Sequence, residues 1–334
     1  MTANTATHSA APTPTPTPDS TRLMPLKGLR ILSLALNLPG PAAVRRCRQM
    51  GAVCVKLEPP AKADVPAGTT GDPMSRYSPA AYAALQQGVK VRTADLKSTA
   101  GQALLHRELA RADVLVTSFR PSALHKLGLG WKALHQRYPA LSQVAIVGGP
   151  GAAAESPGHD LTYLAENGLV PGLDLPATLY ADMAGALQAT EAVLQAALLR
   201  GGTGRGAGRG VYLEIALSDA AATLALPRGW GLTASGAVVG GGHAGYAVYS
   251  CKNGRVAVAA LEPHFAQALC IAAGVAWNGE ATMTQADTHA AVARFLATQT
   301  CAALDRLARS RDIPLTTMGK STAHVLIQSP VRNR

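Results

Sequence analysis

The sequence predicts an α/β protein with a Rossmann-like, doubly wound parallel sheet and a second, smaller α+β domain. Between residues 29 and 147, short apolar segments typical of buried strands alternate with segments of helical periodicity. Strands that alternate with helices form parallel sheets. Hydrophobic residues make up 48% of the chain and aromatic residues only 4%. An aliphatic core of this kind favours helices packed on a parallel sheet over an aromatic-rich β-sandwich.

The elements of the first domain follow in chain order. Strands are predicted over residues 29–35, 53–57, 114–117 and 141–147, and helices over residues 41–50, 101–110 and from 121 to 126. The helix at 41–50 has a proline in its first turn, where the missing N–H costs nothing. Pro59 and Pro60 end the second strand, because proline cannot continue the hydrogen-bonded ladder.

Past Gly148 the chain is richer in glycine and alanine, and a long helix is predicted over residues 182–200. The segment 201–210 (GGTGRGAGRG) has the composition of a phosphate-binding loop. It lacks the terminal Lys-Ser/Thr and follows a helix rather than opening one, so a linker is favoured. A strand over 211–215 and a helix over 218–226 come next.

The second domain is expected to contain a β-hairpin, with strands over 246–251 and 255–260. Asn253-Gly254 lies between them, and this dipeptide is a strong hairpin turn signal. Helices are predicted over 263–273 and 288–298. We therefore expect a disordered Thr/Pro-rich tail at 1–22, a large domain at 23–220, a small domain at 221–320 and a short tail at 321–334.

The net charge of +11, from 31 Lys+Arg and 20 Asp+Glu, favours an anionic partner. Nucleic acid is one candidate, but the basic residues are scattered and no nucleic-acid-binding motif is present, so none is expected. A small polyphosphate ligand needs only a few of these cations. The composition is therefore best explained by a ligand of that kind and an otherwise solvated surface.

No run of about 20 apolar residues is present, so we expect no membrane span. The first residues lack the pattern of a signal peptide. The five cysteines are an odd number without CxxC or Cys/His metal spacing, which indicates reduced thiols and no metal site. These observations together predict a cytoplasmic protein.

Three segments combine an ionisable residue with an unusual loop or helix start: residues 157–163 with His159, residues 180–185 with Asp182, and residues 260–265 with Glu262. Each also has an ordinary explanation. His159 suits a solvated loop, Asp182 suits a helix N-cap, and Glu262 suits the first turn of a helix. The residues alone thus indicate an α/β enzyme with a candidate His/Asp/Glu site.

A resemblance to a known family extends this interpretation. It lies in PLKGLRILSLALNLPGPAA and GAVCVKLEPP near the start, GDP at 71–73, ADLKSTAGQALLHRELARADVLVTSFRPSALHKLGLG at 94–130, and TGRGAGRGVYLEIALSDA at 203–220. In this order the segments resemble family III CoA-transferases (CaiB/BaiF type) over nearly the whole chain after residue 24. GHDLTY, ADMAG and ALEPHF resemble the active-site segments of the α-methylacyl-CoA racemase branch.

The resemblance implies that His159 and Asp182 exchange protons with the substrate and that Glu262 orients His159. The chemistry suits these residue types, because a thioester acidifies its α-carbon and moving that proton between faces requires two bases. A carboxylate on the histidine would raise its basicity and fix its tautomer. The enolate oxygen needs donors, and N–H groups at a helix start near Asp182 are candidates.

The resemblance further implies CoA contacts from Arg120, Asp160 and Tyr163. The family's adjacent basic residues before the DLK segment are reduced here to Lys90 and Arg92. CoA is expected as part of the substrate, with no tightly bound cofactor. The large domain is therefore expected to bind CoA.

Two other activities stay open. A CoA-transferase would use Asp182 to attack the thioester and form an anhydride. A degenerate member would bind CoA without turnover, a view motivated by the short segment after Thr317. The resemblance also implies an interlocked homodimer with His159 and Asp182 from one chain and Glu262 from the other.

Overall fold

The computed structural model describes residues 23–66, 68–201 and 208–319. The chain divides into two compact units. The described parts of the first unit lie within Met1–Ile146 and Ala189–Leu213, and those of the second within Val147–Gln188 and Glu214–Leu326. The tails expected at 1–22 and 321–334 lie outside the described residues, as does most of the glycine-rich segment. The boundary expected near residue 220 stays a prediction.

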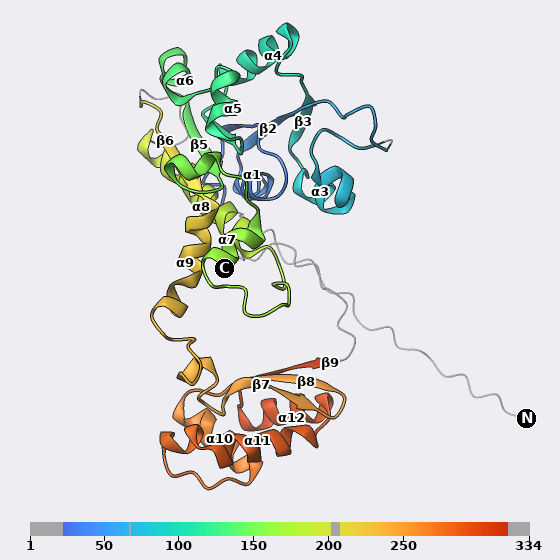
Figure 1. Ribbon diagram of the computed structural model, residues 1–334, viewed down its shortest axis with the longest axis vertical. Coiled ribbons are helices and arrows are strands. Elements are labelled where there is room, and N and C mark those ends of the chain that lie inside the picture. Colours follow the sequence, from blue (N-terminus) through green and yellow to red (C-terminus); the bar gives the residue numbers. More distant parts are fainter. Residues whose placement is uncertain (1–22, 67, 202–207, 320–334) are drawn as a thin grey trace, which may run out of the picture. The chain divides into compact units, whose positions relative to one another are not determined.

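The first unit contains most of a six-stranded sheet in the order β3-β2-β1-β4-β5-β6, and only the last residues of β5 and β6 are counted in the second unit (Figure 1). Its strands are β1 Arg30–Ser33, β2 Val53–Glu58, β3 Lys90–Thr93, β4 Val114–Thr117, β5 Ser142–Val147 and β6 Tyr212–Ala216. From β3 to β5 all neighbours pair in parallel. The strand order reverses between β1 and β4, so the predicted doubly wound α/β fold is confirmed.

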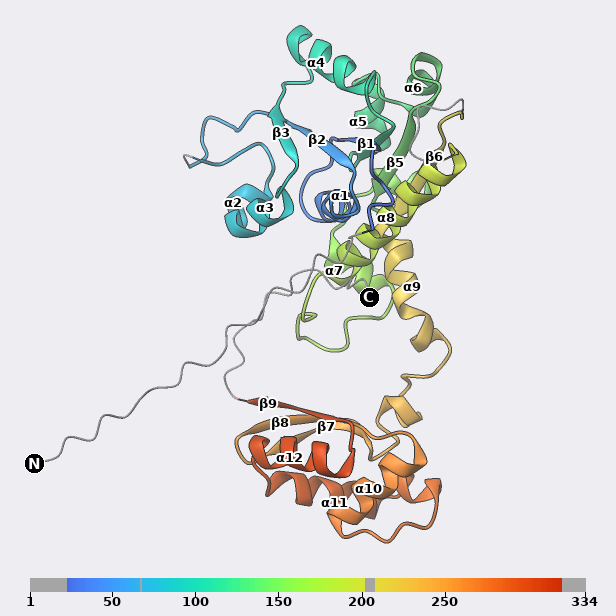
Figure 2. The ribbon, with the colours of Figure 1, turned by 180° about the vertical axis from the view of Figure 1, so that it is seen from behind.

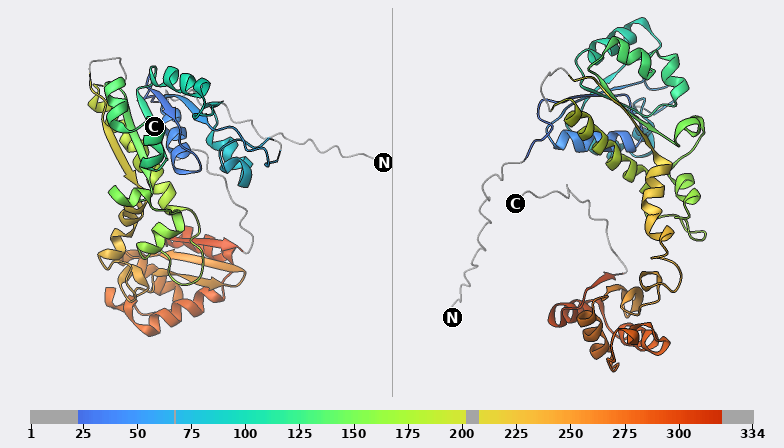
Figure 3. Two further views of the ribbon diagram at one scale, coloured as in Figure 1. Left: turned by 45° about the horizontal axis from the view of Figure 1, so that its top comes forward. Right: turned by 90° about the vertical axis from the view of Figure 1, so that its left-hand side faces the viewer.

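Helices cover both faces of this sheet. They are α1 Pro39–Gln49, α2 Met74–Tyr77, α3 Pro79–Leu85, α4 Thr99–Leu109, α5 Pro121–Lys126 and α6 Trp131–Arg137. Figure 3 shows α1 and the second part of α8 (Tyr180–Leu199) on one face, with α4, α5 and α6 on the other. Every residue of β4 and β5 is buried, as expected for parallel strands covered on both sides. Between the sheet and helices α4–α6 lies an aliphatic cluster that includes Leu32, Leu105 and Leu134.

Helix α1 follows β1 after a short loop and lies beside the sheet (Figure 2). A Cβ added at Gly40 would lie 2.2 Å from the Cβ of Ala35, so only glycine fits there. Pro39 and Pro41 both occupy the first turn and are buried. The helix begins at Pro39 rather than at residue 41, because the fixed φ of proline suits the first helical position.

The second unit begins with the 3₁₀ helix η1 Gly151–Glu155 and helix α7 Asp160–Glu166, followed by the first part of α8 Tyr180–Leu199 and by α9 Leu217–Gly229. Helix α8 starts two residues before the predicted position. At Gly185 it lies so close to α9 that an added Cβ would be 2.3 Å from Cδ2 of Leu217. A glycine in mid-helix thus allows the two helices to pack against each other.

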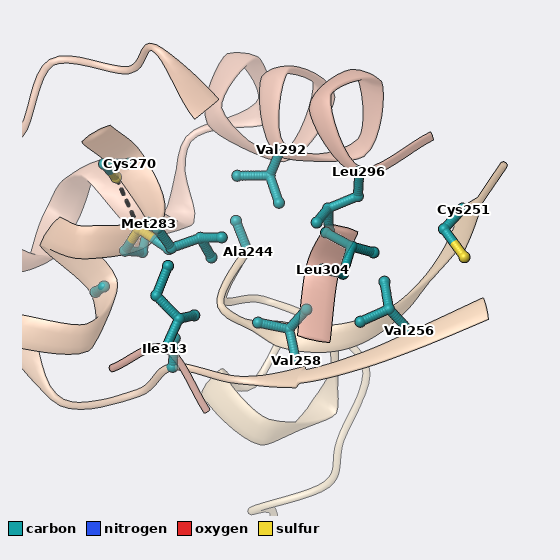
Figure 4. Packing of buried hydrophobic residues seen from close by; sticks show 13 residues of the cluster. Ala244, Cys251, Val256, Val258, Cys270, Met283, Val292, Leu296, Leu304 and Ile313 are labelled. Carbon is teal, nitrogen blue, oxygen red and sulfur yellow. Dashed lines mark hydrogen bonds between the residues drawn. The ribbon is translucent and has the colours of Figure 1, made fainter. Parts of the chain in front are cut away.

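The rest of the second unit is an antiparallel sheet covered by helices, in the order β7-β8-β9. The elements are η2 Val238–Gly240, β7 Tyr246–Cys251, β8 Gly254–Ala259, α10 Pro263–Ala273, η3 Glu280–Thr284, α11 Ala286–Ala297, α12 Cys301–Arg311 and β9 Leu315–Gly319. Val256, Leu296 and Leu304 meet between sheet and helices (Figure 4). The predicted hairpin and the smaller α+β domain are confirmed.

Within the described ranges, none of the helices is both long and apolar enough to cross a membrane. All five cysteines are free. Cys251 and Cys301 are neighbours, with their Sγ atoms 3.6 Å apart.

Candidate active site

His159 directly precedes α7 and has extended backbone angles. The Thr162 hydroxyl accepts a hydrogen bond from the His159 N–H at 3.1 Å and donates one to the His159 carbonyl at 2.8 Å. A threonine in the first helical turn thereby satisfies backbone groups that the helix start leaves unpaired. The backbone of His159 is held in place while its side chain is exposed.

Asp160 is the first residue of α7, and its side chain is buried, with 5% of the residue exposed. Its Oδ1 accepts a hydrogen bond from the backbone N–H of Asp182 at 2.9 Å. Asp182 is the third residue of α8, where helix N–H groups have no partner inside the helix. The N–H of Asp182 is therefore used within the protein rather than offered to an enolate oxygen.

The side chain of Asp182 has a raised pKa of about 6, compared with 3.8 for an ordinary aspartate. Burial is the largest cause, the negative charge of Asp160 the second, and the opposing charge of His159 reduces the effect. The hydrogen bond from the Asp182 N–H to Asp160 places the start of α8 beside Asp160 and its chain neighbour His159. A carboxyl group that titrates near neutral pH can both accept and donate a proton.

Tyr163 lies beneath this segment and is only 7% exposed. Added Cβ atoms at Gly148 and Gly158 would lie 2.5 Å and 2.6 Å from its hydroxyl oxygen. The ring is therefore closely covered by two glycine backbones. Tyr163 packs inside the second unit, and its expected CoA contact stays a prediction.

Glu262 precedes α10 as its N-cap residue and is exposed. Its side chain makes no cap hydrogen bond with the helix. Within the described part of the chain, no hydrogen bond or ion pair connects Glu262 to His159. The orienting contact implied by the family resemblance is thus not made within one chain.

The basic residues expected to bind CoA lie in the first unit. Arg120 is exposed at the N-cap of α5, just past the carboxyl end of β4. Close by, the Ser118 hydroxyl accepts a hydrogen bond from the Leu36 N–H at 3.0 Å and joins the loops after β1 and β4. This is the point where the strand order reverses, which is the usual ligand position in open α/β sheets.

Lys90 and Arg92 belong to edge strand β3. Lys90 is exposed at the amino end of the strand, whereas Arg120 follows the carboxyl end of β4 in the same parallel sheet. Arg92 is ion-paired with Glu108 at 3.3 Å. Arg92 is thus already engaged within the first unit, and the expected CoA contacts of Lys90 and Arg92 stay predictions.

A buried charged cluster was missed by sequence reasoning. Lys56 Nζ lies 3.1 Å from Glu58 Oε2 and 2.5 Å from Asp72 Oδ2, and all three residues are at most 2% exposed. The Tyr82 hydroxyl donates to Glu58, and Asp72 Oδ1 accepts the N–H of Asn37. The cluster therefore fixes the loop after β1. The sequence did offer a signal for this cluster: Lys56 lies inside an otherwise apolar strand, and Asp72 lies in the GDP segment that follows.

Comparison with known families identifies the family to which this fold belongs. The sequence model of CoA-transferase family III matches residues 26–331. The chain belongs to CoA-transferase family III.

Relatives within this family include enzymes of two kinds. A cinnamoyl-CoA:phenyllactate CoA-transferase from Clostridium sporogenes is 34% identical over 43% of this chain and 36% of its own length. An α-methylacyl-CoA racemase from Mus musculus is 29% identical over 72% of this chain and 63% of its own length. The chain thus matches between about one third and two thirds of the length of these two family III relatives.

A solved structure of a hypothetical protein from Mycobacterium tuberculosis superposes with a TM-score of 0.73 at 22% identity, covering 93% of this chain and 94% of that one. A CaiB/BaiF family protein from Brucella suis gives a TM-score of 0.68 at 22% identity, covering 88% and 84%. Both likenesses concern the fold, and both agree with the family III assignment.

Proposed function

We propose that this protein moves the proton on C2 of a 2-methyl-branched or related acyl-CoA thioester from one face to the other. The observation that supports this most is the pKa of Asp182, raised to about 6 next to His159. A racemase needs two groups that both lose and regain protons near neutral pH. An imidazole and a carboxyl with a raised pKa meet that requirement.

In the proposed reaction one of the two groups removes the proton from C2, and the electron pair moves onto the thioester oxygen. The other group then donates a proton to the opposite face of C2, and the thioester is restored. No bond to CoA breaks, and no redox change occurs. Both groups afterwards exchange protons with water.

The substrate's CoA part is proposed to bind through Arg120, whose guanidinium is exposed next to the switch point of the sheet. Arginine binds phosphate through paired, charge-assisted hydrogen bonds. With CoA supplied by the substrate, the proposed reaction calls for no tightly bound cofactor. The five free thiols suit the reducing cytoplasm that we propose as its compartment.

We also propose a homodimer in which Glu262 serves the partner subunit. Glu262 is exposed and makes no cap hydrogen bond, which leaves its carboxylate available. Tyr180, Met183 and Leu187 are 40–50% exposed and spaced at three and four residues along α8. Such a spacing forms one apolar stripe, as expected for a helix that packs against another surface.

A CoA-transferase is the second candidate, supported by the transferase relatives and by the same acid. In that reaction an oxygen of ionised Asp182 forms a bond to the thioester carbonyl carbon, and the C–S bond breaks to release CoA thiolate. The CoA thiolate then attacks the Asp182 carbonyl of the anhydride, which releases the donor acid and leaves an enzyme–CoA thioester. The acceptor carboxylate attacks this thioester carbonyl and frees CoA thiolate again, which takes the acceptor's acyl group from the new anhydride and restores the Asp182 carboxylate. A third candidate is a protein that binds CoA without turnover.

Incubation of a 2-methyl-branched acyl-CoA with the protein in deuterated water, followed by NMR, tests the proposal. A racemase incorporates deuterium at C2 without any acceptor acid. We expect His159→Ala to lower exchange by about a hundredfold or more, the usual contribution of a positioned acid–base group. His125→Ala, which removes another exposed histidine, is the matched control.

The alternatives give different results in the same assay. A transferase leaves C2 unlabelled, requires an acceptor acid, tolerates His159→Ala and accumulates an adduct on Asp182 that hydroxylamine traps. A protein that only binds CoA shows neither labelling nor adduct but retains CoA affinity. Either pattern in the wild-type protein would reverse the proposed assignment.

A further inference from the structure

Asp160 and Asp182 are joined by a contact that no local sequence pattern contains. The carboxylate of Asp160, at the start of α7, accepts the backbone N–H of Asp182 in the first turn of α8 at 2.9 Å. The two residues are separated by 22 positions in the chain. The hydrogen bond therefore fixes the starts of two helices relative to each other inside the second unit.

Because Asp160 is buried, its carboxylate can interact with few groups other than the Asp182 N–H. With 5% of the residue exposed, its carboxylate has little surface left for a ligand. A buried carboxylate is stable only when hydrogen-bonded donors or positive charge compensate its desolvation. The Asp182 N–H and the positive end of the 20-residue helix α8 supply that compensation. Asp160 is thus engaged with Asp182, although the family resemblance implies a CoA contact.

We propose that Asp160 is a positioning residue that holds the backbone of Asp182 and sets a negative charge beside its carboxyl group. This inference rests on the proposed role of Asp182 as an acid–base group. The hydrogen bond fixes the helix turn from which the Asp182 side chain extends. The neighbouring charge disfavours the ionised form of Asp182, so that its carboxyl keeps a proton closer to neutral pH.

Two charged groups from α7 and its N-cap act on Asp182, and they oppose each other. Asp160 raises the pKa of Asp182, after the larger effect of burial, and His159 lowers it. Among the described residues no other charged group contributes. Removal of the Asp160 charge should therefore lower the pKa of Asp182 while the effect of burial remains.

The experiment compares Asp160→Asn with Asp160→Ala. Asparagine keeps a carbonyl oxygen that can accept the Asp182 N–H but removes the charge, whereas alanine removes both. We expect Asp160→Asn to shift the ionisation that controls kcat to lower pH, with a modest loss of kcat. Asp160→Ala should lower kcat by about tenfold or more, because a misplaced acid–base group is inefficient. CoA affinity should change less than twofold in both.

Asp219→Asn is the matched control, because it removes the same charge from an exposed position in the first turn of another helix, α9, and leaves Asp160 in place. It should not shift the ionisation of Asp182. If Asp160→Asn and Asp160→Ala leave both kcat and its pH profile unchanged, the inference is wrong. It is equally wrong if they weaken CoA binding while kcat and its pH profile stay intact, since Asp160 would then be a ligand contact.

Two measurements keep the test independent of turnover and of variant folding. NMR of ¹³C-labelled aspartate side chains, assigned with Asp182→Asn, follows the titration of Asp182 directly with and without the Asp160 charge. Amide hydrogen exchange in the wild-type protein reports the Asp182 N–H, which should be protected although first-turn amides normally exchange fast. A fast-exchanging Asp182 amide would overturn the inference, whereas a wild-type protein without any activity overturns only the proposed function.

Discussion

The hydroxyl end of Tyr163 lies against the backbone of Gly148 so closely that a Cβ on that glycine would be 2.5 Å from the hydroxyl oxygen. Gly158 covers the same ring from the segment that leads into His159. The buried Tyr163 ring therefore supports the start of α7 by packing against both glycine backbones. Two glycines on either side of the 3₁₀ helix η1 make room for it.

Gly148→Ala should lower stability by about 1–3 kcal/mol, because the buried tyrosine ring cannot move away without disturbing the helix start. Chemical unfolding measures the change. Gly229→Ala is the control, since an added Cβ there meets nothing within 4 Å. Equal stabilities for the two variants would show that the tyrosine adapts freely.

Asp182→Asn should stabilise the protein at neutral pH by about 1–3 kcal/mol while destroying activity. The pKa of Asp182 is about 6 when folded and 3.8 as the ordinary value. The folded state therefore holds its proton more tightly, and stability falls as pH rises from below 3.8 to above 6. Asparagine removes that loss. Thermal unfolding at pH 7.5 should show a gain in Tm that shrinks toward pH 4, and a gain independent of pH would contradict this explanation.

Arg120→Ala should weaken CoA binding by about 1–3 kcal/mol if its guanidinium contacts a phosphate. Isothermal titration calorimetry measures the affinity. Arg107→Ala removes the same charge from an exposed site in the last turn of α4, which leads to the amino end of β4. Its affinity should match the wild type, and an equal loss in both variants would indicate a general charge effect.

Leu304→Ala should cost about 2–5 kcal/mol, because Leu304 is fully buried in the core of the second unit (Figure 4). Hydrogen exchange with mass spectrometry locates the loss in β7, β8 and α12. Ile271→Ala, at a position 57% exposed in α10, should change stability by at most about 0.5 kcal/mol. A cost for Leu304→Ala no larger than that of Ile271→Ala would refute the assigned core.

The elements that the sequence predicted are those with a clear apolar pattern. Strands β1, β2, β4 and β5 are buried along almost their whole length, so their composition alone indicated them. Strand β3 was missed, because it is an edge strand whose four residues are exposed or half-buried. Helix α12 was missed as well, since its sequence contains four charged residues among eleven. The face of α12 that carries Leu304 is buried in the core of the second unit, and the residues of that core come from segments far apart in the sequence.

In the candidate site, too, some features could be predicted from the local sequence and others depend on the fold. His159 and Asp182 stood out as ionisable residues in unusual segments, and the hydrogen bond between Asp160 and Asp182 brings those segments together. The role of Asp182 as a helix N-cap, considered from its residue type, is wrong, because α8 begins at Tyr180 and the Asp182 N–H is itself capped. Asp160, the capping residue, is 22 positions away, and no spacing rule within a helix or strand covers that separation.

The first turn of α1 contains Pro39 and Pro41, so two of the backbone donors that a helix start normally presents do not exist. Related sheets that bind dinucleotides grip the pyrophosphate with such donors. At the start of α1, a phosphate group would have to be bound mainly by side chains, because part of the backbone donors is missing. The start of α1 therefore lacks part of the amide donor set that makes other helix N-termini ready anion sites, even though this helix directly follows β1.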